Sequence, residues 1–227
     1  MHRSSFCRLS VTIAVVLGSS GCSSSSEAVS AEETPPSTGA ASEVAVVAAF
    51  LGDSYTVESL DGGGYVPATA QALGWTPVLD AISGTGYVAT GNQADGAPYR
   101  DRVGDVVAED PDIVIVQGST NDVGTPAADV GEAAAQLYDD LERRLTDARI
   151  VAVGPTAPSG VDRAAVLAIR DALRTAAGDA AIPFIDPIAA NWLTPGEGLY
   201  ADAIHPNQAG YDEFADDLVF ALRNAGL

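Results

Sequence analysis

Apolar runs of strand length alternate along this chain with longer segments in which apolar residues recur every three or four positions. Runs typical of strands cover residues 44–51, 77–81, 112–117, 149–153 and 183–185. Segments typical of helices cover residues 66–73, 99–108, 127–147, 161–177 and 207–224. Such alternation is typical of parallel strands joined by crossover helices. The pattern predicts an α/β fold, a three-layer α/β/α sandwich around a five-stranded parallel sheet.

The last helical segment shows the period most clearly. Pro206 suits its first turn and Gly226 its exit. One apolar stripe, able to pack on a sheet, comprises Tyr211, Phe214, Ala215, Leu218, Val219 and Leu222. Open parallel sheets bind their ligands at the carboxyl ends of the strands, so functional residues are expected where the strands run out into loops.

The N-terminal part differs in composition from the rest. Arg3 and Arg8 precede a short apolar stretch and small residues that end at Cys22, which is the layout of a signal peptide over residues 1–22. Cys22 also resembles the lipidated cysteine of a bacterial lipoprotein, although Ser19 departs from that pattern. Residues 23–42 are rich in Ser, Ala and Pro and predict a disordered linker. One domain, residues 43–227, remains, and the protein is expected to be exported, either as a cell-envelope lipoprotein or as a secreted protein.

Composition narrows the chemistry that this domain can perform. The chain of 227 residues has a net charge of -20, and its eleven basic residues are all arginines, so nucleic acid is not expected as a partner. Both cysteines, Cys7 and Cys22, fall in the leader, which leaves no thiol nucleophile and no cysteine metal site in the domain. A single histidine follows the leader. We therefore expect no metal and no cofactor, and contact with a membrane only through a lipid on Cys22.

Polar clusters follow several of the predicted strands. Ser54 comes directly after the first strand, and His205, with Asp202 three residues before it, precedes the last helix. A serine hydroxyl becomes nucleophilic when a base takes its proton and a third group orients that base. Gly84 after the second strand and Asn121 after the third could supply N–H donors to a developing oxyanion. Each cluster also has a plainer interpretation: the glycine, serine and asparagine residues form ordinary turns, and Asp202 could cap the last helix.

Taken together, these clusters resemble the SGNH (GDSL) hydrolase superfamily over the whole domain. Gly52-Asp53-Ser54 resembles the serine block, Ser83-Gly84 the glycine block, Thr120-Asn121-Asp122 the asparagine block, and Asp202-x-x-His205-Pro206 the histidine block. The resemblance implies a flavodoxin-like fold, a Ser54 nucleophile, a His205 base oriented by Asp202, and an oxyanion hole formed by Ser54, Gly84 and Asn121. Ser119 stands where the family usually has glycine, which puts the aim of Asn121 in question.

The function implied is an esterase that hydrolyses carboxylic esters of a small molecule or a glycan and acts as a monomer. Two alternatives remain open. The same site could transfer acyl groups to a hydroxyl or remove acetyl groups from polysaccharide, or the fold could serve a surface lipoprotein that only binds carbohydrate.

Further residues have weaker signals. Asp186 ends the fifth strand and could contact substrate, although strand termination is the simpler interpretation. Trp75 is expected in the core, and Trp192 could either pack in the core or line a pocket. Arg100 and Arg102 could hold an anionic group and are more simply surface charges.

Overall fold

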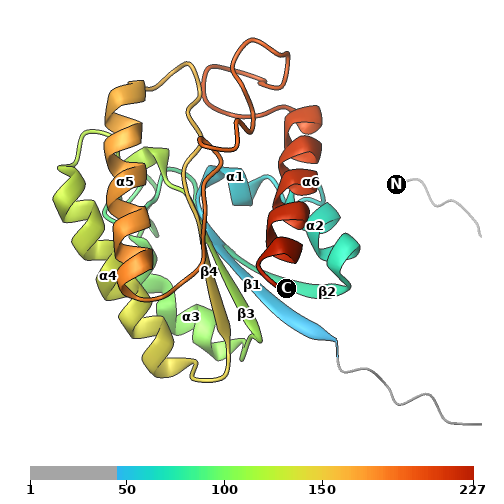
Figure 1. Cartoon of the computed structure of the whole chain (residues 1–227), viewed down its shortest axis with the longest axis vertical. Helices are drawn as coiled ribbons and strands as arrows, with labels where there is room; N and C mark the ends of the chain where they lie inside the picture. The colour runs from blue at the N-terminus through green and yellow to red at the C-terminus, as the bar shows by residue number, and fades with distance from the viewer. Residues whose placement is uncertain (1–44) are drawn as a thin grey trace, which may run out of the picture. The chain divides into compact units, whose positions relative to one another are not determined.

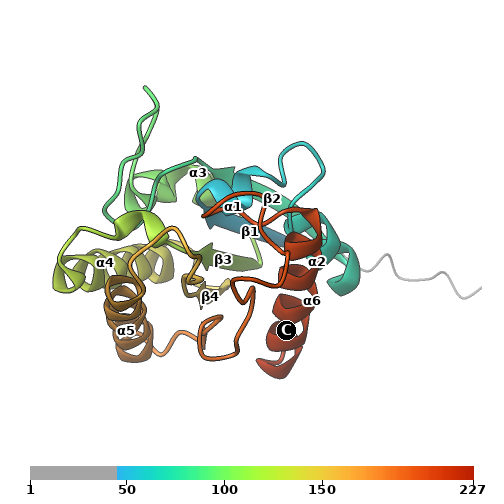
Figure 2. The ribbon, with the colours of Figure 1, turned by 90° about the horizontal axis from the view of Figure 1, so that it is seen from above.

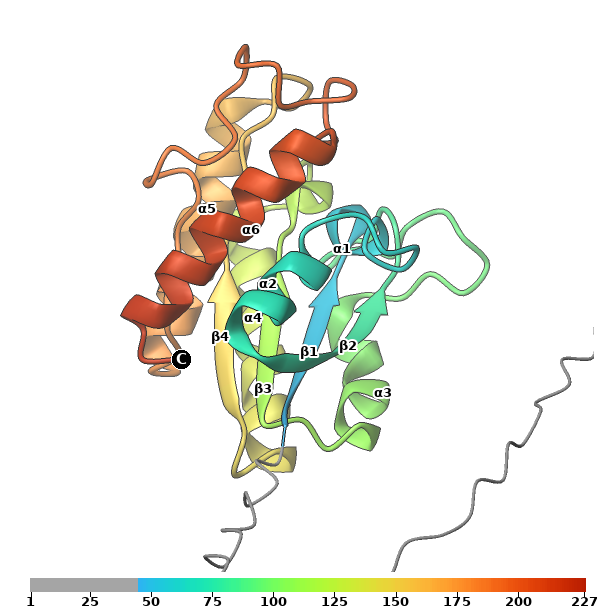
Figure 3. The same ribbon diagram turned by 90° about the vertical axis from the view of Figure 1, so that its right-hand side faces the viewer.

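The computed structural model describes residues 45–227, which belong to one compact unit. Five parallel strands form a single sheet in the order β2-β1-β3-β4-β5. They are β1 (Val46–Gly52), β2 (Trp75–Ala81), β3 (Ile113–Gln117), β4 (Arg149–Val153) and β5 (Phe184–Ile185). Figure 3 shows β1, β3 and β4 pointing in one direction, so their carboxyl ends meet at the same edge of the sheet.

Helices cover both faces of the sheet (Figure 1). One face carries α3 (Val103–Ala108), α4 (Ala127–Arg144) and α5 (Arg163–Asp179), and the other carries α2 (Val66–Leu73) and α6 (Gln208–Asn224). A short helix, α1 (Ser54–Val57), continues from the end of β1. The expected three-layer α/β/α sandwich is confirmed.

Alternate residues of the central strands fill the two cores. In β3, Val114 and Val116 pack with α4 and α5, whereas Ile113 and Ile115 pack with α6. Because successive strand residues point to opposite faces, a strand covered on both sides must be apolar throughout. The buried run of β3, IVIVQ, meets that requirement up to its last residue.

The two edges of the sheet are formed by unlike strands. β2 has seven residues, includes Pro77, and is less buried than the central strands. β5 has only two residues. Looking down on the molecule, Figure 2 also shows the loop after β2 projecting beyond the body of the domain.

Several predicted boundaries shift in the structure. Residues 99–108 were expected to form one helix, but a 3-10 turn, η1 (Tyr99–Arg102), precedes α3. α4 ends at Arg144 rather than at residue 147, and α5 begins at Arg163, where the side chain of Asp162 accepts a hydrogen bond from Ala165 N–H. Pro206 lies outside the last helix, because Asn207 caps it by accepting from Gly210 N–H.

The sequence pattern did not indicate α1, which starts at a polar residue within a turn-like segment. Val44, the predicted leader of residues 1–22 and the linker of residues 23–42 lie outside the described residues. Within residues 45–227, none of the helices combines the length and the apolar character needed to cross a membrane.

Candidate active site

The candidate nucleophile stands at the first turn of α1. β1 is buried from Ala48 to its end, and the next residue, Asp53, caps α1 by accepting a hydrogen bond from Tyr55 N–H at 3.0 Å. Capping by Asp ends the strand and starts the helix within one residue, so Ser54 is presented at the edge of the sheet. Its side chain is partly exposed, whereas Asp53 is 2% exposed.

The structure brings the three predicted catalytic residues together. Ser54 Oγ lies 3.1 Å from His205 Nε2, and His205 Nδ1 lies 2.9 Å from Asp202 Oδ2. Asp202 Oδ1 also accepts from the backbone N–H groups of Ile204 and His205, each at 2.7 Å. Asp202 does not cap α6, since Asn207 does so. These contacts fix the histidine loop around one carboxylate.

A tyrosine that the sequence did not single out joins the two halves of this site. The Tyr55 hydroxyl donates to the carbonyl of Ile204 at 2.7 Å and is 3.0 Å from Thr156 Oγ1. Since Tyr55 follows Ser54 and Ile204 precedes His205, one buried side chain sets the distance between the serine and histidine segments.

Two backbone N–H groups near the serine are free to bind an oxyanion. Neither Ser54 N–H nor Gly84 N–H donates to any atom within residues 45–227. Gly84 has φ +77°, in the left-handed region that favours glycine. Asn121 Nδ2 donates to the Thr85 carbonyl at 2.9 Å and to Asp53 Oδ2 at 3.3 Å. An oxyanion would therefore compete with the longer of those two bonds, the bond to Asp53.

Ser119 takes part in the local hydrogen bonding at the position where the family usually has glycine. It is buried, its Oγ donates to the Thr85 carbonyl at 3.0 Å, and the same Oγ accepts from Asn121 N–H at 2.9 Å. Gly118, one residue earlier, has φ +112°, and a Cβ there would approach Asp53 Oδ2 to 2.9 Å. The loop thus accommodates a serine and still places Asn121 at the site.

The glycine loop is held by Asp122, the residue after Asn121. This buried carboxylate accepts backbone N–H bonds from Tyr87, Val88 and Ala89 at 2.8–2.9 Å. A Cβ at Gly86 would lie 2.5 Å from Asp122 Oδ2, so a side chain there would displace the carboxylate. The sequence placed Asp122 in the asparagine block without indicating this role.

Arg102 contradicts its interpretation as a surface charge. Its side chain is only 4% exposed and pairs with Asp80 Oδ1 at 2.7 Å. It also donates to the Gly52 carbonyl at 3.0 Å and to Thr85 Oγ1 at 3.3 Å, and so joins the serine segment to the glycine loop. Arg102 has these buried acceptors because it lies on the inner side of η1. Arg100, by contrast, is exposed and pairs with Asp140.

Two carboxylates beside the serine have shifted pKa values in opposite directions. Burial raises the pKa of Asp53 to about 6, although the Tyr55 N–H opposes this shift. The pKa of Asp202 lies well below its usual range, chiefly because its carboxylate accepts from His205 N–H and then from the His205 ring and Ile204 N–H. Asp202 therefore stays ionised across the neutral range and can hold Nδ1–H of the imidazole.

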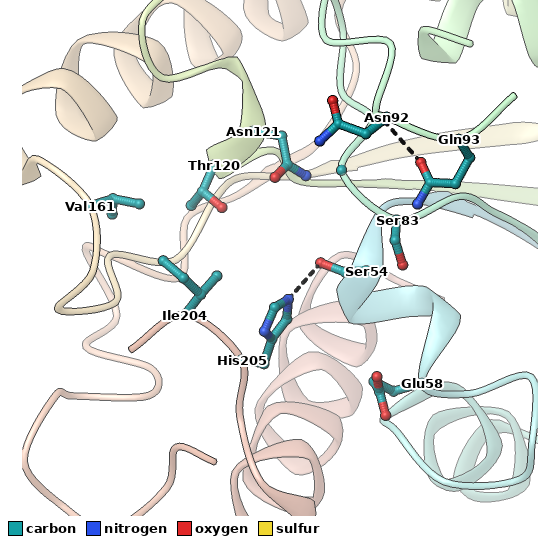
Figure 4. Close-up of a pocket in the computed structure, with 11 residues that line it drawn as sticks. Ser54, Glu58, Ser83, Asn92, Gln93, Thr120, Asn121, Val161, Ile204 and His205 are labelled. Atoms are coloured by element: carbon teal, nitrogen blue, oxygen red, sulfur yellow. Dashed lines mark hydrogen bonds between the residues drawn. The ribbon is translucent and has the colours of Figure 1, made fainter. Parts of the chain in front are cut away.

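A pocket of about 460 Å³ surrounds the serine (Figure 4). Ser54, Gly84, Asn121 and His205 all contribute to its lining. The remaining lining residues, none of which the sequence analysis proposed as substrate contacts, are Glu58, Ser83, Asn92, Gln93, Thr120, Val161 and Ile204.

Three other candidates lie away from this pocket. Asp186 Oδ2 pairs with Arg170 at 2.9 Å, and Asp186 Oδ1 accepts from Ala189 N–H, so the interpretation as a strand terminator holds. Trp192 is 8% exposed and packs edge-on against Phe214, which places it in the core. Trp75 is partly buried against the same core.

An α/β sandwich whose sheet edge carries a hydrogen-bonded serine, histidine and carboxylate over an open pocket defines a serine hydrolase of ester bonds. A model of the GDSL-like lipase/acylhydrolase family matches residues 50–213, and the chain belongs to that family. This confirms the resemblance seen in the sequence.

Known proteins agree with this assignment. A GDSL lipase from Mycobacterium tuberculosis is 30% identical over 181 residues, which cover 75% of this chain and 78% of that protein. Among solved structures, a GDSL-like protein from Parabacteroides merdae has a TM-score of 0.64 at 20% identity, over 78% of this chain and 94% of its own. A family two carbohydrate esterase from Clostridium thermocellum, in complex with cellohexaose, has a TM-score of 0.63 at 20% identity, over 79% and 64%. These two structures share the fold.

Proposed function

We propose that this protein is an exported serine esterase that hydrolyses carboxylic esters through an acyl-enzyme on Ser54. The contact between Ser54 Oγ and His205 Nε2, at 3.1 Å, carries the proposal. It places the only imidazole of residues 45–227 in position to take the serine proton, and Asp202 holds the other ring nitrogen.

The first half of the reaction forms the acyl-enzyme. His205 Nε2 takes the proton of Ser54 Oγ as this oxygen attacks the ester carbonyl carbon. The carbonyl oxygen becomes an oxyanion, which Ser54 N–H, Gly84 N–H and Asn121 Nδ2 stabilise. The intermediate then collapses, the bond from carbon to the alcohol oxygen breaks, and His205 returns its proton to the departing alcohol.

The second half releases the acid. Water enters the position that the alcohol has left, His205 takes one of its protons, and the hydroxyl oxygen attacks the acyl carbon. The second tetrahedral intermediate expels Ser54 Oγ, which recovers its proton from His205. The partial exposure of the His205 ring, 37% of its side-chain surface, supports access of water to this step.

Hydrolysis of p-nitrophenyl acetate, butyrate and octanoate by the full chain tests this proposal. We expect turnover by the wild type and loss to background in Ser54→Ala and His205→Ala, because each variant lacks one partner of the proton transfer. Circular dichroism of all three proteins controls for folding. Turnover that persists in folded Ser54→Ala would remove Ser54 from the role of nucleophile.

Export is proposed on the composition of residues 1–22 alone. Cys22 would carry a lipid in the lipoprotein form and would be an ordinary residue in the secreted form. Mass spectrometry of the mature N-terminus separates the two forms, since a lipidated Cys22 carries the added mass of a diacylglyceryl group on its sulfur and an unmodified Cys22 does not. An intact N-terminus that begins at Met1 would refute export by this route.

A further inference from the structure

The pocket has different chemistry on its two sides. In Figure 4, Val161 and Ile204 lie on one side of Ser54, and Ser83, Gln93 and Glu58 lie on the other. The first side presents two branched apolar side chains together with the Thr120 hydroxyl, and the second offers a hydroxyl, an amide and a carboxylate. The two parts of an ester can match these two sides. A hydrocarbon acyl chain suits the side of Val161 and Ile204, and an alcohol with further hydroxyl groups suits the polar side.

The polar groups on the second side are available to a ligand. Within residues 45–227, the side chains of Ser83, Asn92 and Glu58 make no hydrogen bond to other residues, although all three line the pocket. Gln93 Oε1 accepts from Asn92 N–H at 3.1 Å, which holds the Gln93 side chain against the loop and leaves its amide N–H donors for a ligand. Asparagine and glutamine amides supply paired donors and acceptors, which suit neighbouring hydroxyl groups.

Two of these residues, Asn92 and Gln93, stand on a loop that is fixed at its base. Asp122 holds residues 87–89 through three backbone N–H bonds, and Gly96 N–H donates to the Gln93 carbonyl at 3.1 Å. A fixed loop loses little conformational entropy when a ligand binds. Hydrogen bonds from Asn92 and Gln93 would therefore contribute most of their free energy to binding.

The charges around the pocket favour a neutral alcohol. None of the lining residues is an arginine, and Glu58 is the only carboxylate among them. The whole chain, with a net charge of -20, adds to the negative potential. An alcohol that carries a phosphate or a carboxylate would meet repulsion here with no cation to offset it.

The side of Val161 and Ile204 is bounded by two segments in close contact. The segment of Gly160 and Val161 packs closely on the segment of Ala203 and Ile204: Gly160 N–H donates to the Ala203 carbonyl at 2.7 Å, and a Cβ at Gly160 would lie 2.6 Å from Ile204 Cδ1. Two branched side chains on segments in such close contact form a wall and not a channel. Such a wall would stop a long acyl chain close to Ser54 and favour a short one.

We propose that the natural substrate is a short-chain acyl ester, such as an acetate, of an uncharged alcohol with several hydroxyl groups, as in a neutral sugar. Ser83, Asn92 and Gln93 recognise the hydroxyl groups of the alcohol, and Glu58 disfavours anionic substrates. This substrate class rests on the serine esterase activity proposed above.

A matched pair of substrates isolates the recognition of hydroxyl groups. Glucose that carries one acetyl ester on its primary hydroxyl and ethyl acetate share the acyl group and the type of ester, but only the first has neighbouring hydroxyls. We expect kcat/KM of the wild type to be at least about 10-fold higher for the acetylated glucose, as two or three added hydrogen bonds would give.

Variants of the loop then test which residues recognise the hydroxyl groups of the alcohol. Asn92→Ala and Gln93→Ala should each lower kcat/KM for acetylated glucose about 3- to 10-fold more than they lower kcat/KM for ethyl acetate and p-nitrophenyl acetate. Thr90→Ala, an exposed residue of the same loop that does not line the pocket, serves as the control and should match the wild type on all three substrates. Glu58→Gln should raise kcat/KM for an acetylated glucuronate.

The outcomes separate this inference from the esterase assignment. If no ester is turned over in a manner that depends on Ser54, the esterase assignment fails. If p-nitrophenyl acetate is hydrolysed through Ser54 but acetylated glucose and ethyl acetate are equivalent, the recognition of hydroxyl groups is wrong. Equal losses on all substrates in Asn92→Ala and Gln93→Ala, or a preference for octanoate over acetate, would also overturn the inference.

Discussion

Replacing Asp53 by asparagine should make the folded protein more stable and the enzyme slower. The Asp53 side chain is 2% exposed, its Oδ1 accepts from Tyr55 N–H, and its Oδ2 accepts from Asn121 Nδ2 at 3.3 Å. Asparagine has nearly the same shape and can keep the Tyr55 bond through its oxygen, because Asn and Asp are comparable helix caps. The amide nitrogen of the new side chain, however, would face Asn121 Nδ2, so two donors would meet.

The effect on stability follows from the pKa of Asp53. Burial raises this pKa from 3.8 to about 6, so the folded protein binds an extra proton between those two pH values. Stability therefore falls as pH rises through that window, and the loss is complete above it, at about 3 kcal/mol. The neutral amide of the Asp53→Asn variant would remove this loss. The broken contact with Asn121 would lower the free energy of unfolding by about 1 kcal/mol. The net gain at pH 8 should be about 2 kcal/mol.

The effect on activity has the opposite sign. In the wild type the Asp53 carboxylate attracts Asn121 Nδ2 and so holds this donor beside the oxyanion, whereas the amide introduced by Asp53→Asn repels it and should displace it from that position. Loss of one oxyanion donor typically lowers kcat by about 10²–10³. A variant that is both more stable and less active would show that the buried charge of Asp53 lowers the free energy of unfolding and supports activity.

Urea unfolding at pH 4 and pH 8 and the hydrolysis of p-nitrophenyl acetate test both effects. We expect the stability advantage of Asp53→Asn to be near zero at pH 4 and to grow toward pH 8. If the difference in unfolding free energy is the same at the two pH values, Asp53 is not the buried charge described here. If kcat is unchanged, the contact with Asn121 does not position an oxyanion donor.

Further substitutions probe the surroundings of the site. Asn121→Ala should lower kcat for p-nitrophenyl acetate about 10²- to 10³-fold with KM little changed, as steady-state kinetics would show. Arg102→Met leaves Asp80 without its partner at a largely buried position and should cost about 3 kcal/mol of unfolding free energy in urea. Gly86→Ala should cost about 1–3 kcal/mol in thermal unfolding, because its Cβ would overlap a carboxylate oxygen 2.5 Å away. Gly104→Ala, on an open helix surface, is the control and should stabilise slightly in the same thermal assay.

The hydrophobic pattern predicted the fold because parallel strands and amphipathic helices have strong and distinct periods. β4 has the predicted bounds, and the other strands differ by at most two residues at an end within the described part of the chain. The short helix α1 was missed because a helix of four residues contains only one turn, too little for a period to show.

The candidate catalytic residues were foreseeable because each follows a strand or precedes a helix at the carboxyl ends of the strands. The supporting contacts were harder to foresee, since they join segments far apart in the sequence, as Tyr55 does with Ile204. Arg102 did carry a signal. Together with Tyr99, Val103 and Val106, it occupies positions spaced by three, four and seven residues, and all four are buried. An arginine on such a stripe predicts a buried partner.

The loop that we propose contacts the substrate was not predictable from a periodic pattern. Asn92 and Gln93 lie in a segment with no periodic pattern. The three hydrogen bonds between Asp122 and residues 87–89, which fix the base of this loop, form only in the folded protein. Polar loop residues are common, so only the three-dimensional structure distinguishes those that line a pocket from those that face solvent.

The unlike edges of the sheet bear on how this protein behaves at high concentration. An exposed edge strand is a template for a strand of another molecule, and pairing of this kind leads to fibrous aggregates. Here one edge includes Pro77, which has no N–H to donate, and the other is the two-residue strand β5. Neither edge offers a long uninterrupted row of donors and acceptors, and the strong negative charge keeps copies apart. The fold thus limits intermolecular sheet growth at both outer strands, while the candidate active site at the carboxyl ends of the strands stays open to solvent.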